Sequence, residues 1–183
     1  ALTVRPVAFS TIFLLFLMHI LVSNKRHYLL PLLFVLWANF HADFVLGLFI
    51  LCVYTVFVFL RNYKKSISLV FISSASFFVT FINPNFYKLH LTILNEISTS
   101  FFQSKYISEW FPLLSHSQIS FVALFFFFVI IFFLYFDSLP NWFRFCLMFF
   151  LIFSFKSIYF TRIFLILLMF VFKFDLSEQI KKI

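Results

Sequence analysis

The sequence predicts an all-α protein, a polytopic transmembrane helical bundle, and composition is the first observation behind that prediction. Of its 183 residues, 64% are hydrophobic and only 11% are charged. A soluble domain carries about 25% charged residues, because it must cover its surface with polar groups. The second observation is a pattern of long apolar runs separated by short polar connections. Residues 1–183 are therefore expected to form a single transmembrane domain.

We expect about seven membrane-spanning helices. In chain order, the expected spans are 7–23, 29–40, 44–60, 66–82, 119–136, 143–155 and 163–174. A helix of about 20 residues crosses a bilayer, so the second span and the last two are short. Pro31 stands in the first turn of its expected helix, where its missing N–H costs no hydrogen bond. Pro84, Pro112 and Pro140 fall in connections and support these boundaries.

The first apolar run is expected to be a retained span and not a signal peptide. No small-x-small cleavage pattern follows it, and Lys25 and Arg26 come directly behind. The chain begins at Ala1, and we expect it to be a fragment of a longer protein. His19, in the middle of this span, is expected to be a core residue bonded to a neighbouring helix.

The distribution of basic residues predicts the orientation. If every span crosses, one side carries Lys25, Arg26, Arg61, Lys64, Lys65, Arg144, Lys181 and Lys182. That side is expected to be cytoplasmic. Arg5, Lys88, Lys105, Lys156 and Arg162 fall on the other side. The net charge of +8 then needs no nucleic acid, because basic residues at the membrane edge face anionic lipid.

A polar break at residues 37–43 interrupts an apolar run, and it predicts a helical hairpin with its tip at one membrane face. Asn39, His41 and Asp43 lie at this break. Polar groups in hydrocarbon are costly and usually face water, a protein interior or a site. The predicted topology puts the tip outside the cytoplasm, together with His90, Glu96, Glu109 and His116. Chemistry is therefore expected on that face.

The long connection 83–118 is expected to contain an amphipathic helix lying in the membrane interface. Leu94, Ile97 and Phe101 recur at helical spacing with polar residues between them. Tyr106 and Trp110 suit the headgroup level. Such a helix could roof a groove that opens to lipid, or it could be an anchor without a ligand.

Several short motifs, taken in order, resemble a family of bacterial membrane glycosyltransferases. They are Arg5-Pro6, Trp37-Ala-Asn-Phe-His41 with Gly47-Leu48, Asn83-Pro84 and Glu109-Trp110, followed by Arg162 ahead of the last expected span. The family has the C-class fold and is related to protein O-mannosyltransferases and aminoarabinose transferases. Ala42-Asp43 stands where relatives carry paired glycines, and Val7 where they carry Gln.

The resemblance implies an enzyme of the cytoplasmic (inner) membrane that uses a polyprenyl-phosphate-linked sugar donor. The acceptor would be a glycan, lipid or protein outside the cytoplasm. In such enzymes a carboxylate in the first extracytoplasmic loop activates the acceptor. That loop lies upstream of every motif matched here, so the catalytic base is expected outside this chain.

The residues themselves suggest roles for a phosphate-linked sugar. His41 could donate a hydrogen bond to a phosphate oxygen or orient a carboxylate, with Asn39 and Asp43 beside it. Glu109 could accept a hydrogen bond from a sugar hydroxyl while Trp110 stacks on the ring. The basic residues Lys88, Lys105 and Arg162 could neutralise the phosphate leaving group. Each could instead be an ordinary solvated or interfacial residue.

A divalent metal is conceivable but not predicted. His41, Asp43, His90 and His116 offer suitable donors, yet no pair has a zinc-ligand spacing on one helix. No cofactor is evident. Two other classes of protein stay open: a transporter or channel, with the break at 39–43 as a discontinuous helix, and a non-catalytic subunit of a membrane complex.

Overall fold

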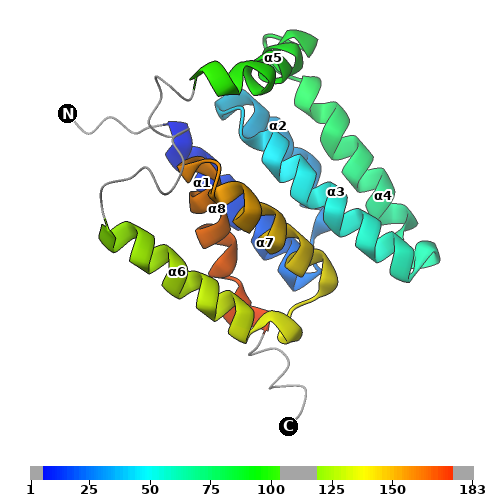
Figure 1. Ribbon diagram of the computed structural model, residues 1–183. Helices are drawn as coiled ribbons and strands as arrows, with labels where there is room; N and C mark the ends of the chain where they lie inside the picture. Colours follow the sequence, from blue (N-terminus) through cyan, green and yellow to red (C-terminus); the bar gives the residue numbers. More distant parts are fainter. Residues whose placement is uncertain (1–5, 104–118, 175–183) are drawn as a thin grey trace. The chain divides into compact units, whose positions relative to one another are not determined.

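The computed structural model describes residues 6–103 and 119–174, and every regular element within them is helical (Figure 1). The all-α prediction is confirmed. The helices are α1 (Pro6–Ser23), η1 (His27–Leu29), α2 (Leu30–Phe40), α3 (Phe44–Arg61), α4 (Tyr63–Phe78), η2 (Val79–Phe81), α5 (Tyr87–Gln103), α6 (Ile119–Leu134), η5 (Phe136–Ser138), α7 (Asn141–Ser154) and α8 (Ile158–Leu168). Residues 171–174 add a further helical turn.

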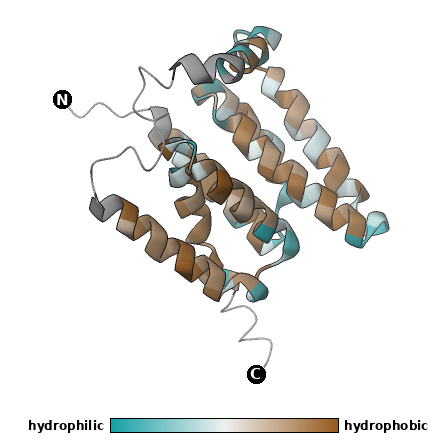
Figure 2. Ribbon diagram, in the orientation of Figure 1, coloured by the Kyte–Doolittle hydropathy of each residue, from teal (hydrophilic) through white to brown (hydrophobic). Residues whose placement is uncertain are grey.

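Helix length supports one membrane span among the described residues. Only α3 there is both long and apolar enough to cross a bilayer, while five other apolar helices have 10–17 residues. About seven spans therefore stay a prediction. Figure 2 shows that the helices are largely apolar and that hydrophilic residues gather in their connections.

The last expected span was placed too late in the chain. It was predicted for 163–174, but α8 begins at Ile158. The hydroxyl of Ser157 accepts a hydrogen bond from the backbone N–H of Tyr159 at 3.2 Å and caps the helix there. Arg162 consequently lies inside α8, where it was expected to precede the span.

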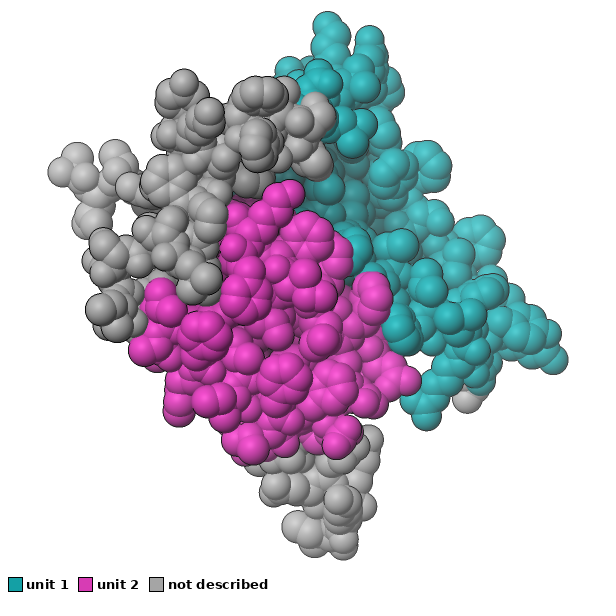
Figure 3. All heavy atoms as spheres, viewed as in Figure 1, with its two compact units in different colours: residues 1–95 teal, residues 96–183 magenta. Residues whose placement is uncertain are grey.

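The chain divides into two compact units, residues 1–95 and 96–183 (Figure 3). In the first unit, α2 packs against α1 and α4, and α3 packs along α4. The second unit pairs α7 with α8, and α6 also contacts α8. The boundary falls inside α5. Consecutive helices of the first unit are antiparallel, so two of their turns meet at one end and the α2–α3 turn lies at the other.

The single glycine of the chain allows α2 and α3 to pack closely. Gly47 lies against the Trp37 indole, and a Cβ at this position would collide with Cζ3 of the ring. It would also stand 2.9 Å from Cη2 of Trp37 and 3.1 Å from Cε1 of Phe34. Trp37 and Phe34 are both buried, with their rings stacked at 5.9 Å. The hairpin therefore needs a residue without a side chain here.

His19 does not belong to the core of the first unit. It is exposed on α1, while its neighbours Met18 and Ile20 are buried. The expectation of a core histidine was wrong because position in a helix gives depth along the axis but not the face that is buried.

The turn between α1 and α2 is fixed to the middle of α3. The Tyr54 hydroxyl donates to Oδ1 of Asn24 at 3.0 Å and lies 3.5 Å from Nε2 of His27. Asn24 and Arg26 both have left-handed backbones, with φ of 51° and 60°. This conformation is uncommon outside glycine, and Asn tolerates it best.

We expect acid to destabilise the first unit through His27. Burial lowers the pKa of His27 from its ordinary value of 6.5, so the unfolded chain takes up the proton more readily than the folded one. The stabilisation is complete above pH 6.5 and is lost as the pH falls through the folded pKa. Denaturation of the full chain in detergent at pH 7.5 and pH 5.5 measures it, with His27→Gln as comparison. The variant should lose less stability than the wild type on acidification; equal losses would contradict the prediction.

Candidate functional site

The α2–α3 turn forms a helical hairpin tip, as the polar break predicted. Helix α2 ends at Phe40, and the N–H of His41 still bonds the carbonyl of Trp37 at 3.0 Å. His41 itself is extended, and α3 begins at Phe44 directly after Asp43. Only Ala42 and Asp43 make the turn, which holds the His41 and Asp43 side chains close together.

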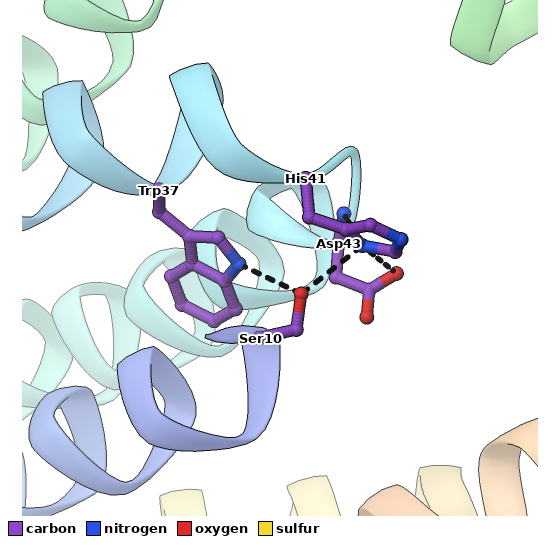
Figure 4. A network of polar contacts seen from close by, with 4 residues as sticks. All are labelled: Ser10, Trp37, His41 and Asp43. Carbon is purple, nitrogen blue, oxygen red and sulfur yellow. Dashed lines mark hydrogen bonds and ion pairs between the residues drawn. The ribbon is translucent and has the colours of Figure 1, made fainter. Parts of the chain in front are cut away.

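Four side chains form a polar network at this tip (Figure 4). Nδ1 of His41 lies 3.0 Å from the Ser10 hydroxyl and 3.1 Å from the Asp43 carboxylate. The Trp37 indole N–H donates to the same Ser10 oxygen at 3.3 Å. Ser10 comes from α1 and Trp37 from α2, so the network joins two helices to the turn. Ser10 and Trp37 are buried, while the side chains of His41 and Asp43 are 26% and 12% exposed.

Two protonation states of His41 suit this geometry differently. A neutral ring with a bare Nδ1 could accept from the Ser10 hydroxyl and from the Asp43 N–H, which lies 3.3 Å away. It would then turn a lone pair toward the Asp43 carboxylate. A proton on Nδ1 instead donates to that carboxylate, and a second proton on Nε2 makes an imidazolium paired with Asp43. The bond from the Asp43 N–H suits the bare nitrogen, and the 3.1 Å approach of the carboxylate suits the protonated one, so the geometry fits either state.

The Ser10, His41 and Asp43 arrangement is not a hydrolase triad. In a triad the imidazole uses Nδ1 for the carboxylate and Nε2 for the serine, so that it can pass a proton between them. Here both partners approach Nδ1. The network therefore orients the ring, and Nε2 lies on the opposite edge of the imidazole.

Asn39 ties the hairpin to the connection between α4 and α5. Its amide nitrogen donates to the carbonyl of Val35 and to the carbonyl of Ile82, both at 2.8 Å. Ile82 follows η2 directly. The side chain predicted to bind substrate thus holds two backbone segments together at the edge of the site.

Helix α5 begins at the same end of the first unit as the hairpin tip, and His90 holds it there. The Thr80 hydroxyl donates to the carbonyl of Phe77 at 2.7 Å, so it accepts from Nε2–H of His90 at 3.0 Å. The imidazole stacks on Phe81 at 4.2 Å and meets Phe44 edge-on at 5.5 Å. His41 and His90, predicted to share a face, therefore lie at one end of the unit.

The predicted amphipathic helix coincides with α5. In the first turns of α5, the side chains of His90 and the buried Ile93 face the rest of the first unit. Leu91 and Leu94 are more than half exposed. A helix that is apolar on its outer side as well suits a lipid interface. Its position in a membrane stays a prediction.

The remaining predicted site residues fall in three places. Lys88 is exposed in the first turn of α5. Lys105, Glu109 and Trp110 lie outside the described residues. Arg162 belongs to the second unit, where its guanidinium stacks on the Tyr159 ring at 5.0 Å from the centroid.

No three His, Cys, Asp or Glu side chains of the described ranges are placed to hold a metal ion. His41 and Asp43 are adjacent, and His90 is engaged with Thr80. His116, the fourth donor considered, lies outside those ranges.

Sequence reasoning did not find Ser10. It lies 31 positions before His41 on another helix, and no local spacing links the two. The antiparallel packing of α1 on α2 brings them together. A serine within an apolar span was the only available signal.

Comparison of the chain with protein-family models, with curated proteins and with solved structures gives no match.

Proposed function

We propose that this chain is part of a multi-pass protein of the cytoplasmic membrane that transfers a sugar outside the cytoplasm. The donor would be a polyprenyl-phosphate-linked sugar, and the acceptor a glycan, lipid or protein. The observation that carries the proposal is the pairing of His41 with Asp43, which holds an imidazole and a carboxylate 3.1 Å apart at the hairpin tip. The family resemblance of the motifs around it supplies the reaction class.

The exposed surface of the helices supports a membrane location. Phe71 and Phe78 of α4 are 72% and 67% exposed, and Leu134 of α6 is 76% exposed. Exposed apolar side chains of this size recur along most helices. Soluble monomers rarely expose apolar patches beyond a few hundred Å². In lipid the same side chains are well solvated.

The His41 cluster suits a phosphate leaving group. In the transfer, the acceptor's nucleophile bonds to the anomeric carbon and gives its proton to a base, while the bond between that carbon and the phosphate oxygen breaks and charge builds on the phosphate. An imidazolium held by Asp43 through Nδ1 can donate Nε2–H to a phosphate oxygen as that charge develops. Exposed Lys88, at the same end of the unit, would add a second positive charge. The acceptor's base is expected upstream, so the cluster serves the donor.

A transfer assay tests this function. The full-length parent protein, reconstituted in vesicles, is given a polyprenyl monophosphate carrying a radiolabelled hexose and a membrane extract as acceptor source. Label should move to the extract and free polyprenyl phosphate should appear in equal amount. Vesicles without the protein serve as control. Failure of transfer with several hexoses, from protein that is correctly inserted, would contradict the proposal.

A further inference from the structure

The two ends of the first unit differ in charge. Asp43 is the only acidic residue in the first 95 positions, and it lies at the hairpin tip. At the opposite end, Lys25 and Arg26 stand in the α1–α2 turn, and Arg61 and Lys64 flank the α3–α4 turn. All four are exposed. No acid within the first unit balances this end, so its counter-ions come from outside.

The two basic turns lie at different depths along the bundle. Asn24 and His27 are held at the level of Tyr54, seven residues before Arg61 in α3. At 1.5 Å per residue, Arg61 therefore lies about 10 Å further out than the α1–α2 turn. The stretch between them exposes Phe59 and Leu60, the latter by 76%. These apolar side chains favour lipid around α3 up to Arg61.

Of these four cations, Lys25 and Arg26 consequently lie closer to the hydrocarbon. A charged side chain at that depth is costly unless it reaches a counter-charge. Lipid phosphates provide one, because long basic side chains extend along apolar surface toward them. Tyr28, 69% exposed beside the turn, is a side chain typical of the same interface.

The turn is also built to stay in place. Asn24 accepts the Tyr54 hydroxyl, and the carbonyl of Arg26 accepts the N–H of Leu29 at 3.0 Å. The basic side chains therefore project from a fixed backbone and not from a loose loop.

We propose that the α1–α2 turn binds the phosphate group of an anionic phospholipid through Lys25 and Arg26. The inference rests on the membrane location in the proposed function but not on sugar transfer. The ligand is the headgroup phosphate of a lipid whose acyl chains lie along the exposed face of α3. A nucleic acid is disfavoured, because Phe59 and Leu60 would have to face water beside it.

Native mass spectrometry of the full chain, released from detergent with dioleoyl phosphatidylglycerol or dioleoyl phosphatidylcholine, tests the site. The first phosphatidylglycerol should bind about tenfold more tightly than phosphatidylcholine, because only in phosphatidylcholine does a choline cation already balance the phosphate charge. The double variant Lys25→Gln/Arg26→Gln should lose most of that preference. The matched variant Arg61→Gln/Lys64→Gln removes the same charge from the outer turn and should keep more than half of it.

Equal loss in both double variants, or no preference in the wild type, would overturn the proposal. So would displacement of the lipid by excess inorganic phosphate, which would assign the turn to free phosphate. Binding of a fluorescent single-stranded RNA that depends on Lys25 and Arg26 would assign it to nucleic acid. Thermal unfolding in detergent confirms that both double variants fold. Because no sugar donor is used, failure here is distinct from failure of the transfer assay.

Discussion

Replacing His41 with alanine is expected to reduce sugar transfer by the full-length protein about 10- to 100-fold. A hydrogen bond to a charged group is worth about 1.5–3 kcal/mol, and about 1.4 kcal/mol corresponds to a factor of ten in rate. If Nε2 donates to the phosphate as proposed, that hydrogen bond would strengthen as the leaving group gains charge, so the substitution should lower kcat more than it raises KM.

His19→Ala is the matched control for this substitution. It removes an exposed imidazole from α1, far along the chain from the hairpin tip, and should leave transfer unchanged. Asp43→Asn and Ser10→Ala remove partners of Nδ1 and should have smaller effects than His41→Ala, because the ring itself remains. Membrane abundance of each variant is measured in parallel. If His41→Ala transfers sugar as well as His19→Ala, His41 is not part of the site.

Gly47→Val is expected to cause the largest loss of stability. The new side chain would enter the space of the Trp37 indole, which is stacked between Phe13 and Phe34 and bonded to Ser10. Moving the ring aside would disrupt its contacts with Phe13 and Phe34 and its bond to Ser10. Overpacking typically lowers the free energy of unfolding by about 1–3 kcal/mol, and we expect a loss at the upper end of this range. The free energy of unfolding of the full chain in mixed detergent and dodecyl sulfate measures it.

A second substitution at Trp37 separates this clash from other effects. Trp37→Phe removes the ring atoms that a side chain at position 47 would meet. The double variant Gly47→Val/Trp37→Phe should therefore be more stable than the sum of the two single changes by about 1 kcal/mol or more. Ser74→Val, a similar enlargement at an exposed position of α4, should stay within about 0.5 kcal/mol of the wild type. Strict additivity would show that the indole is not the obstacle.

The hairpin and the boundaries of α1, α2 and α3 could be predicted because their signals are local, whereas α4 begins at Tyr63, three residues before the expected span. The polar break at 37–43 gives the turn, and Pro31 stands in the first turn of α2 as expected. The start of α8 was missed because the polar residues Lys156, Ser157, Thr161 and Arg162 were all assigned to the connection, whereas Ser157 caps a helix that contains the last two. A hydropathy pattern does not reveal a helix start that depends on a single side-chain hydrogen bond.

Only the part of the candidate site formed by residues close together in the sequence could be predicted. His41 and Asp43 are two positions apart, so their pairing was foreseeable. The contribution of Ser10 and the docking of His90 on Thr80 depend on which faces of two helices meet. A single sequence carries the period of each helix but not its rotation relative to a neighbour.

The bond from Asn39 to Ile82 limits how α5 can move. With the carbonyl of Ile82 tied to α2, and the imidazole of His90 stacked on Phe81, the first turn of α5 is clamped to the hairpin. If α5 moves to uncover the tip for a bulky lipid-linked sugar, the hinge would therefore have to lie after His90. The first turn of α5 would stay fixed against the hairpin.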